Sequence, residues 1–327
     1  MNKVTVQKFL FFLLMGNPWL LAADELASNS STLPWFTSPL IAPIGEVIPI
    51  GHYVIQPFFE FNSITGFYDK HWHNHSIPNF FNHTTFVEII VGLTKWMDVQ
   101  INPALLYNHT QNQASWHFGD FPLTFDFQLL PVDKFKYFPG IMLGLTESFP
   151  TGKYQKLNPS KLATDVSGNG SFATTANLVF YKIYHLTGLH FLSMTASFGY
   201  TYYAPVHVRG FNFYGGGFGC AGKVYPGSSF GAIVSFELSL SRNWALALDN
   251  VYTHFNKTRF RGTPGQSAVP FVPAVVGKPS SEVLSFAPAI EYNFNENWGI
   301  IAGAWCSAAG RNSVVFRNAL ISLIYQY

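Results

Sequence analysis

The sequence contains little charge, and it lacks a long apolar run beyond its first residues. Only 11% of its 327 residues are charged, whereas 48% are hydrophobic and 17% are aromatic. An average soluble domain carries about 25% charged residues. A membrane-spanning helix needs about 20 mostly apolar residues, and no segment after Ala23 supplies them. Because only helices and closed barrels satisfy every backbone polar group in lipid, a membrane location would require a β-barrel.

Cysteine is equally scarce, which argues against a metal-binding or redox framework. Cys220 and Cys306 are the two cysteines of the chain, and they form neither a CxxC motif nor a spacing typical of metal ligands. An even number permits one disulfide bond in an exported protein. The alternative is that both are small apolar residues.

The N-terminus is typical of a removable secretion signal. Two lysines precede the short apolar run Phe9 to Met15, and Ala22 and Ala23 offer small residues for cleavage, although the A-x-A pattern is imperfect. The run is too short for a membrane anchor. No cysteine follows it, so we do not expect a lipoprotein.

We expect residues 1–23 to be the signal peptide, and the rest of the chain divides by composition into two parts. We expect residues 24–49 to be an N-terminal extension or a plug inside a barrel. Leu33 to Pro49 is apolar and rich in proline, which suits either alternative. We expect residues 50–327 to form the barrel itself.

Apolar and polar residues alternate with a period of two from about Gly51 to the C-terminus. The alternation is clearest in 97–108, 123–130, 230–240 and 284–294. An apolar outer face and a polar inner face on every strand are the signature of a membrane barrel. A soluble β-sandwich would also alternate, but the polar faces here are mostly Ser, Thr, Asn, Gln and Gly rather than charged residues.

Short and long connections also alternate. The segments that predict short turns lie near 95–96, 132–136, 184–187, 242–243 and 296–297, and the long polar connections lie near 63–83, 109–117, 151–168, 204–227 and 257–281. A tight link at Gly310 to Asn312 is the exception. With both termini at the short-turn end, we predict an all-β protein, a transmembrane antiparallel β-barrel of about 12 strands, with 10 or 14 as alternatives.

Acids and bases separate on this map. Bases fall in turns and beside loops, and we expect none in the middle of a strand. Seven acids have inward parity: Glu60, Glu88, Asp98, Asp126, Glu237, Asp249 and Glu291. A charge that faces lipid at the midplane costs about 2–4 kcal/mol for a base and less for an acid, so we predict that these acids face the lumen. They make a wet, acidic lumen that disfavours anions, or else they lie near the rims and pair with loop cations.

Few residues suggest other chemistry. His71, His73 and His75 form an H-x-H-x-H pattern that is able to bind zinc or copper in an extended segment, but we favour a solvated loop. Barrel hydrolases place a serine near a histidine base, and the segments 74–76, 82–84 and 108–110 have the wrong spacing. The glycine-rich segment 210–222 lacks the following helix and lysine of a phosphate loop. We therefore expect neither an enzyme nor a cofactor, and no nucleic-acid partner.

The order of motifs from Gly92 to about residue 230 resembles a known family. The segments that carry the resemblance are Gly92 to Val99 (GLTKWMDV), Gly119 to Phe121 (GDF), Phe127 to Leu130 (FQLL), Phe149 to Tyr154 (FPTGKY) and Gly168 to Ser171 (GNGS). They are similar to the family named for the MetA-pathway of phenol degradation, a group of outer-membrane barrels often described as transporters. Lys95-Trp96 replaces the usual Asp-Arg, and Phe121 follows Gly-Asp unusually.

The resemblance implies a porin-like channel or transporter for small solutes, including hydrophobic or aromatic compounds. We expect a protein exported through the periplasm to the outer membrane of a Gram-negative-type bacterium. Its partners would be membrane lipid, a small-molecule solute and lipopolysaccharide, because surplus positive charge in the loops suits phosphates. The alternative is a non-conducting structural or surface-binding barrel whose lumen is packed with side chains.

Overall fold

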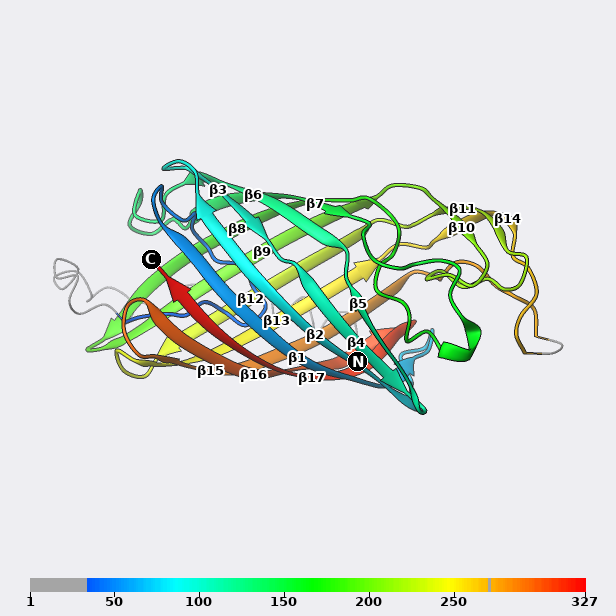
Figure 1. The fold of residues 1–327 in the computed structure, drawn as a ribbon. Coiled ribbons are helices and arrows are strands. Elements are labelled where there is room, and N and C mark those ends of the chain that lie inside the picture. Colours follow the sequence, from blue (N-terminus) through cyan, green and yellow to red (C-terminus); the bar gives the residue numbers. More distant parts are fainter. Residues whose placement is uncertain (1–33, 270–271) are drawn as a thin grey trace.

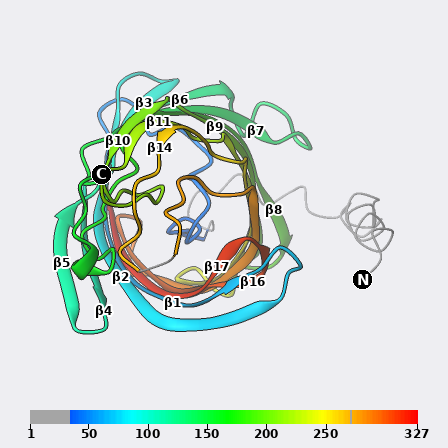
Figure 2. The same cartoon turned by 90° about the vertical axis from the view of Figure 1, so that its right-hand side faces the viewer.

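Strands make up nearly all the regular structure of this protein, and they close into a barrel (Figures 1 and 2). The computed structural model describes residues 34–269 and 272–327, so the predicted signal peptide lies outside the described residues. β1 (Tyr53–Tyr68) pairs with β2 (Asn74–Gly92) on one side and with β17 (Ser313–Gln326) on the other, both antiparallel. These two pairings close the barrel, because they leave β1 with no free edge.

Twelve strands cross the barrel, as the alternation predicts. Two of them are interrupted. β3 (Met97–Ile101) and β4 (Ala104–Thr110) are separated at Asn102-Pro103, and β5 (Gln113–Phe118) and β6 (Phe121–Leu130) are separated at Gly119-Asp120. Besides β1 and β2, the eight uninterrupted strands are β7 (Gly140–Phe149), β8 (Ala173–Thr187), β9 (His190–Tyr203), β12 (Ser229–Ser239), β13 (Trp244–Phe255), β15 (Ser281–Asn293), β16 (Trp298–Arg311) and β17.

The break at Pro103 has a simple physical cause. Proline has no N–H to donate to a strand ladder, and here its carbonyl accepts a hydrogen bond from the Val87 N–H instead. Beyond the break, the hairpin of β4 and β5 leaves the ring of strands (Figure 2). β5 pairs with β4 and with no other described strand.

The two ends of the barrel differ, as the pattern of connections predicts. One end, which we call the short-turn end, lies on the left of Figure 1 with the C-terminus. The opposite end, the long-loop end, carries a small sheet of β10 (Val206–Arg209), β11 (Ala221–Tyr225) and β14 (Arg259–Thr263), together with a 3-10 helix, Pro159–Lys161. The tight link before β17 is present, with Asn312 at a positive φ of 51°.

Two predicted long connections are wrong. The expected loop 63–83 shrinks to residues 69–73, because Tyr68 still pairs with Asn74. The expected loop 109–117 is a tight hairpin in which Gln111 and Asn112 both have positive φ. Polar residues such as Asn and Thr do not prevent strand pairing in a hairpin that extends beyond the ring. The polar composition of both segments therefore predicted loops where the strands continue.

The outer face of the barrel is apolar, and the inner face is polar. Large apolar side chains on the outside include Ile55, Phe59, Leu246, Ile290 and Ile321, all more than a third exposed. The expectation that no base lies in the middle of a strand is wrong for Arg317 and Lys182, which lie inside β17 and β8. No helix among the described residues is long and apolar enough to cross a membrane. Cys220, in the loop sheet core, and Cys306, on β16, are both free thiols.

Candidate solute pathway

The inward faces of the strands collect the acids that the alternation singles out. Asp98, Asp126, Glu237, Asp249 and Glu291 are buried, and Glu60 and Glu88 border an internal cavity. Among the described residues none of the seven forms an ion pair with a lysine or arginine. The described contacts therefore do not include the rim pairing that we considered from the sequence, and the role of these acids in solute passage stays a prediction.

Three of these acids hold the chain that precedes β1. We call residues 34–50 the N-terminal segment; it runs inside the ring of strands (Figure 2). The Thr37 N–H donates to Glu291 at 3.0 Å, the Ile41 N–H to Asp249 at 2.9 Å, and the Ile48 N–H to Asp98 at 2.7 Å. A non-helical segment inside a barrel cannot satisfy its own N–H groups. The carboxyl oxygens of the wall supply the missing acceptors.

Apolar contacts fix the same segment against the wall. Leu40 packs with Ala287, Ile301 and Leu320 from three different strands, and Val47 packs with two further wall residues, Met142 and Val179.

Glycines allow the closest approaches of the segment to the wall. A Cβ on Gly45 would overlap the ring of Tyr181, and a Cβ on Gly92 would overlap the backbone of Pro49. The N-terminal segment is therefore built into the short-turn half of the lumen.

Beside the segment lies the inner cavity, with a volume of about 410 Å³. Glu60, Glu88, Asp98 and Asp126 border it, and no described lysine, arginine or histidine does. Asp98 and Asp126 are direct partners across β3 and β6. Sequence reasoning missed Glu46, a further carboxyl at this cavity. The alternation of inward and outward residues applies only to strands, and Glu46 lies in the N-terminal segment before β1.

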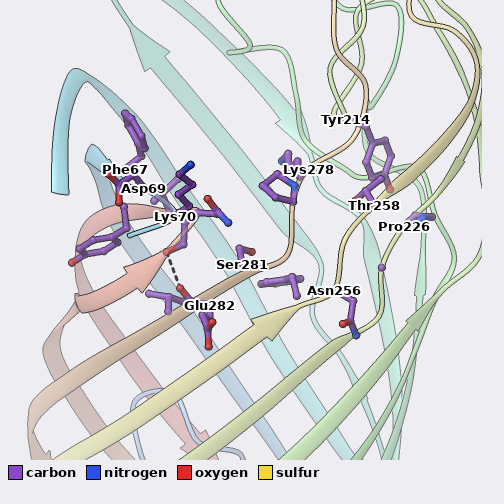
Figure 3. A pocket seen from close by; sticks show the side chains of 18 of the residues that line it. Phe67, Asp69, Lys70, Tyr214, Pro226, Asn256, Thr258, Lys278, Ser281 and Glu282 are labelled. Carbon is purple, nitrogen blue, oxygen red and sulfur yellow. Dashed lines mark hydrogen bonds between the residues drawn. The ribbon is translucent and has the colours of Figure 1, made fainter. Parts of the chain in front are cut away.

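A second, outer cavity of about 850 Å³ lies at the long-loop end (Figure 3). Its walls come from β1, the turn after it, the long loops and the turn before β17. Aromatic residues that border it include Tyr68, Tyr203, Phe213 and Tyr214. Sequence reasoning missed most of this site, because its loop residues follow no period and come together only in the folded chain.

Four aromatic residues whose position in the alternation predicts an inward side chain lie inside the barrel: Phe86, Tyr181, Tyr203 and Trp305. Phe86 borders the inner cavity and Tyr203 the outer one. Tyr181 lies against the N-terminal segment, and Trp305 donates from Nε1 to Ser285 Oγ at 2.9 Å. The lumen therefore offers ring surfaces as well as carboxyls.

The histidine pattern at 71–75 organises a turn. Asp69 Oδ1 accepts the backbone N–H groups of His71 and His73 at 2.7 and 3.0 Å, and Asp69 Oδ2 lies 3.0 Å from His75 Nε2. The hydrogen bond from His75 holds the pKa of Asp69 well below its usual range. His75 stacks on Phe67, and the imidazoles of His73 and His75 both contact the Asp69 carboxylate. In the described ranges no three His, Cys, Asp or Glu side chains are grouped to hold a metal ion.

Two of the segments that resemble hydrolase motifs bring histidines together on strands. His83 Nε2 lies 3.2 Å from His109 Nε2, and Thr84 Oγ1 donates to Asn82. Neither histidine of this pair has a hydrogen bond to a described serine hydroxyl. The arrangement therefore does not hydrogen-bond a described serine nucleophile to a histidine base, the pairing on which serine acyl transfer depends.

Three of the motifs that carry the family resemblance meet at the long-loop end, and we call this meeting point the loop junction. Asp120 accepts hydrogen bonds from the N–H groups of Gly152 at 2.9 Å and Asn169 at 3.0 Å. Thr151 Oγ1 donates to the Gly119 carbonyl at 2.8 Å. Gly168 lies so close to Asp120 that a Cβ would overlap the carboxyl. These glycines and the aspartate join the loop after β7 to the break in the barrel strand.

Comparison with known proteins gives a likeness of fold. No family model and no curated protein sequence matches this chain. The fold is similar to that of an outer-membrane channel from Pseudomonas putida F1, with a TM-score of 0.64 and 14% identity, over 88% of this chain and 100% of that one.

Two further solved structures resemble the chain more weakly. The translocator domain of the autotransporter NalP from Neisseria meningitidis has a TM-score of 0.43 and 9% identity, over 86% of this chain and 90% of that one. The toluene transporter TbuX from Ralstonia pickettii has a TM-score of 0.37 and 9% identity, over 86% and 90%. Scores this low support no argument. The likeness to the Pseudomonas channel establishes the fold, a closed antiparallel barrel of 12 strands.

Proposed function

We propose that this protein is a channel of a bacterial outer membrane that passes small solutes, hydrophobic or aromatic compounds among them. The succession of two cavities inside one barrel supports this proposal most. Tyr68 of β1 borders the outer cavity, and Phe58 and Glu60 of the same strand border the inner one. The two cavities therefore follow one another along β1, from the long-loop end to the N-terminal segment.

We infer that the N-terminal segment is a plug. It occupies the short-turn half of the lumen beside the inner cavity, and three of its N–H groups are hydrogen-bonded by acids of the wall. None of these three bonds belongs to the pairing between barrel strands, so they can be broken without unfolding the barrel. Passage through the whole lumen then requires this segment to shift.

The lining of the two cavities indicates the class of solute. Aromatic walls favour molecules with an apolar body. The carboxyls of the inner cavity have no described cation to offset them and repel anions. We therefore expect neutral or cationic small molecules to pass more readily than anions, and we expect passage without catalysis.

A non-conducting barrel is the second candidate, and the same plug favours it. Proteoliposome swelling with uncharged solutes of increasing size, such as urea, arabinose and sucrose, separates the two. We expect slow swelling with the mature chain and faster swelling when residues 34–48 are removed. A chain that lacks only residues 24–33 is the matched control. If neither the full nor the shortened barrel admits any solute, the protein is a structural barrel.

We further propose that the long-loop end faces the cell exterior and contacts lipopolysaccharide. The sheet of β10, β11 and β14 carries five basic residues, His207, Arg209, Lys223, Arg259 and Arg261, and pairs Lys223 with Arg261. Clustered bases favour phosphate groups. Replacement of Arg209, Arg259 and Arg261 by Gln should weaken salt-sensitive binding of lipopolysaccharide micelles, and unchanged binding would contradict this contact.

A further inference from the structure

The outer cavity has an unequal distribution of charge. Two carboxyl residues, Asp69 and Glu282, and two lysines, Lys70 and Lys278, border it (Figure 3). Both carboxylates are already bound. Asp69 is held by His73 and His75. Glu282 accepts from Arg311 Nε at 2.7 Å and from the Tyr252 hydroxyl at 2.9 Å.

The two lysines have no such partners. In the part of the chain that the structure describes, neither Lys70 nor Lys278 forms an ion pair. Lys278 Nζ lies 4.2 Å from the centroid of the Phe213 ring, a cation–π contact. The cations that the cavity offers to a ligand are therefore these two lysines, and Lys278 lies beside an aromatic surface.

The surroundings of Lys278 disfavour a cation without a counterion. The side chain is accessible from the cavity, yet desolvation by the protein around it lowers its pKa. Burial also raises the pKa of Tyr214, which borders the same cavity and remains a neutral phenol. The two carboxylates of the described wall are engaged by His73, His75, Arg311 and Tyr252, and neither of them pairs with the ammonium of Lys278.

We propose that the outer cavity binds organic carboxylates with one apolar, aromatic-sized body, whose carboxylate contacts Lys278 and whose body packs on Phe213 and Tyr214. The volume of about 850 Å³ lies within the range of small-molecule sites. This inference rests on the proposed function and names a ligand class for its entrance. Lys70 borders the same cavity and is tested separately.

The inner cavity gives this site a consequence for transport. Its four wall carboxyls repel the same anion that Lys278 attracts. A carboxylate is therefore retained at the outer cavity, whereas an uncharged analogue of the same shape is not. The site thus separates capture at the entrance from passage through the lumen.

The test compares an acid with its amide on the folded, full mature protein. We would measure the dissociation constants of 4-phenylbutyrate and 4-phenylbutyramide by calorimetry at neutral pH and low salt. We expect the acid to bind on the order of tenfold more tightly than the amide, since a charge-assisted contact distinguishes them. The preference should vanish in Lys278→Gln, persist in Lys278→Arg, and decrease in Lys70→Gln.

Lys257→Gln is the matched control, because Lys257 lies in the same long connection but does not border the cavity. Heat-dependent migration in detergent gels would establish that each variant is folded. Equal affinity for acid and amide in the unmodified protein would overturn the proposal, as would a preference that survives in Lys278→Gln.

The outcomes also separate this inference from the proposed function. If the amide binds and uncharged solutes enter liposomes while the acid has no advantage, the channel stands and the carboxylate site is wrong. If neither probe binds and no solute enters, both are wrong.

Discussion

At the residue scale, the carboxyls of the wall hold the N-terminal segment because they accept hydrogen bonds from its backbone N–H groups. Asp249 is fully buried, and its Oδ2 accepts the Ile41 N–H at 2.9 Å. The neighbouring residue Leu40 makes an apolar contact with the wall instead. The segment is thus held by alternating polar and apolar contacts, in the same way that a strand would be.

Asp249→Ala should loosen the N-terminal segment without opening the barrel. Loss of the acceptor leaves a buried N–H unsatisfied, at a cost of about 1–3 kcal/mol. Hydrogen exchange at residues 38–44 should accelerate, while exchange in β13 stays slow. Glu147→Ala is the control, because Glu147 accepts from the exposed Thr174 hydroxyl. Equal protection of residues 38–44 in both variants would show that the carboxyl does not hold the segment.

A second prediction at this scale concerns Asp165 in the loop after β7. Burial raises the pKa of Asp165, but the ammonium of Lys153 at 2.7 Å and the Asn158 N–H at 3.1 Å outweigh burial and lower the pKa. A carboxyl whose folded pKa is depressed stabilises the fold above its unfolded pKa, which is about 3.9. That stabilisation is lost as the pH falls through the folded pKa.

Limited proteolysis of residues 151–169 should therefore become faster below about pH 4, at acidities where the barrel itself stays intact. Lys153→Met should expose the loop already at neutral pH, because it leaves a buried carboxylate without its cation. A cleavage rate that is independent of pH, or unchanged in Lys153→Met, would refute this account of the loop.

At the scale of elements, the loop junction connects the loop after β7 to the interrupted strand of β5 and β6 by hydrogen bonds. A Cβ added at Gly152 would lie 2.5 Å from the Ser167 carbonyl oxygen, so the backbone itself must move. Gly152→Ala should lower stability by about 1–3 kcal/mol, read as a lower temperature of unfolding in detergent. Gly231→Ala is the control, since its Cβ would meet nothing within 4 Å. Identical unfolding temperatures would contradict the packing described here.

The strands were predictable and much of the site was not, for physical reasons. A period of two follows directly from a wall with lipid on one side and water or polar groups on the other, so the acids on β3, β6, β12, β13 and β15 were recognised. Loop boundaries at 63–83 and 109–117 were misjudged, because polar residues still pair in hairpins. Lys278 and Phe213 lie in two different long connections, with β12 and β13 between them in the sequence, and no local pattern encodes such a contact.

At the scale of the whole molecule, the two cavities differ in the charged residues of their walls. The outer cavity has two lysines and two carboxyl residues beside aromatic rings, and the inner cavity has carboxyls with no described lysine, arginine or histidine. The N-terminal segment lies beside the inner cavity and shares Asp98 with it. If this segment is the plug that we propose, selectivity and closure are located in the same half of the barrel, and a change to the inner carboxyls should affect both.

The most direct test of this account is the reversal potential in a planar bilayer under a KCl gradient, measured with the mature chain and with a chain that lacks residues 34–48. We predict cation selectivity in the conducting barrel. It should decrease when Glu88→Gln, Asp98→Asn and Asp126→Asn are combined, because these residues border the inner cavity. Anion selectivity, or cation selectivity that the three substitutions leave unchanged, would contradict the acidic inner cavity. The absence of conductance from both chains would contradict the channel itself.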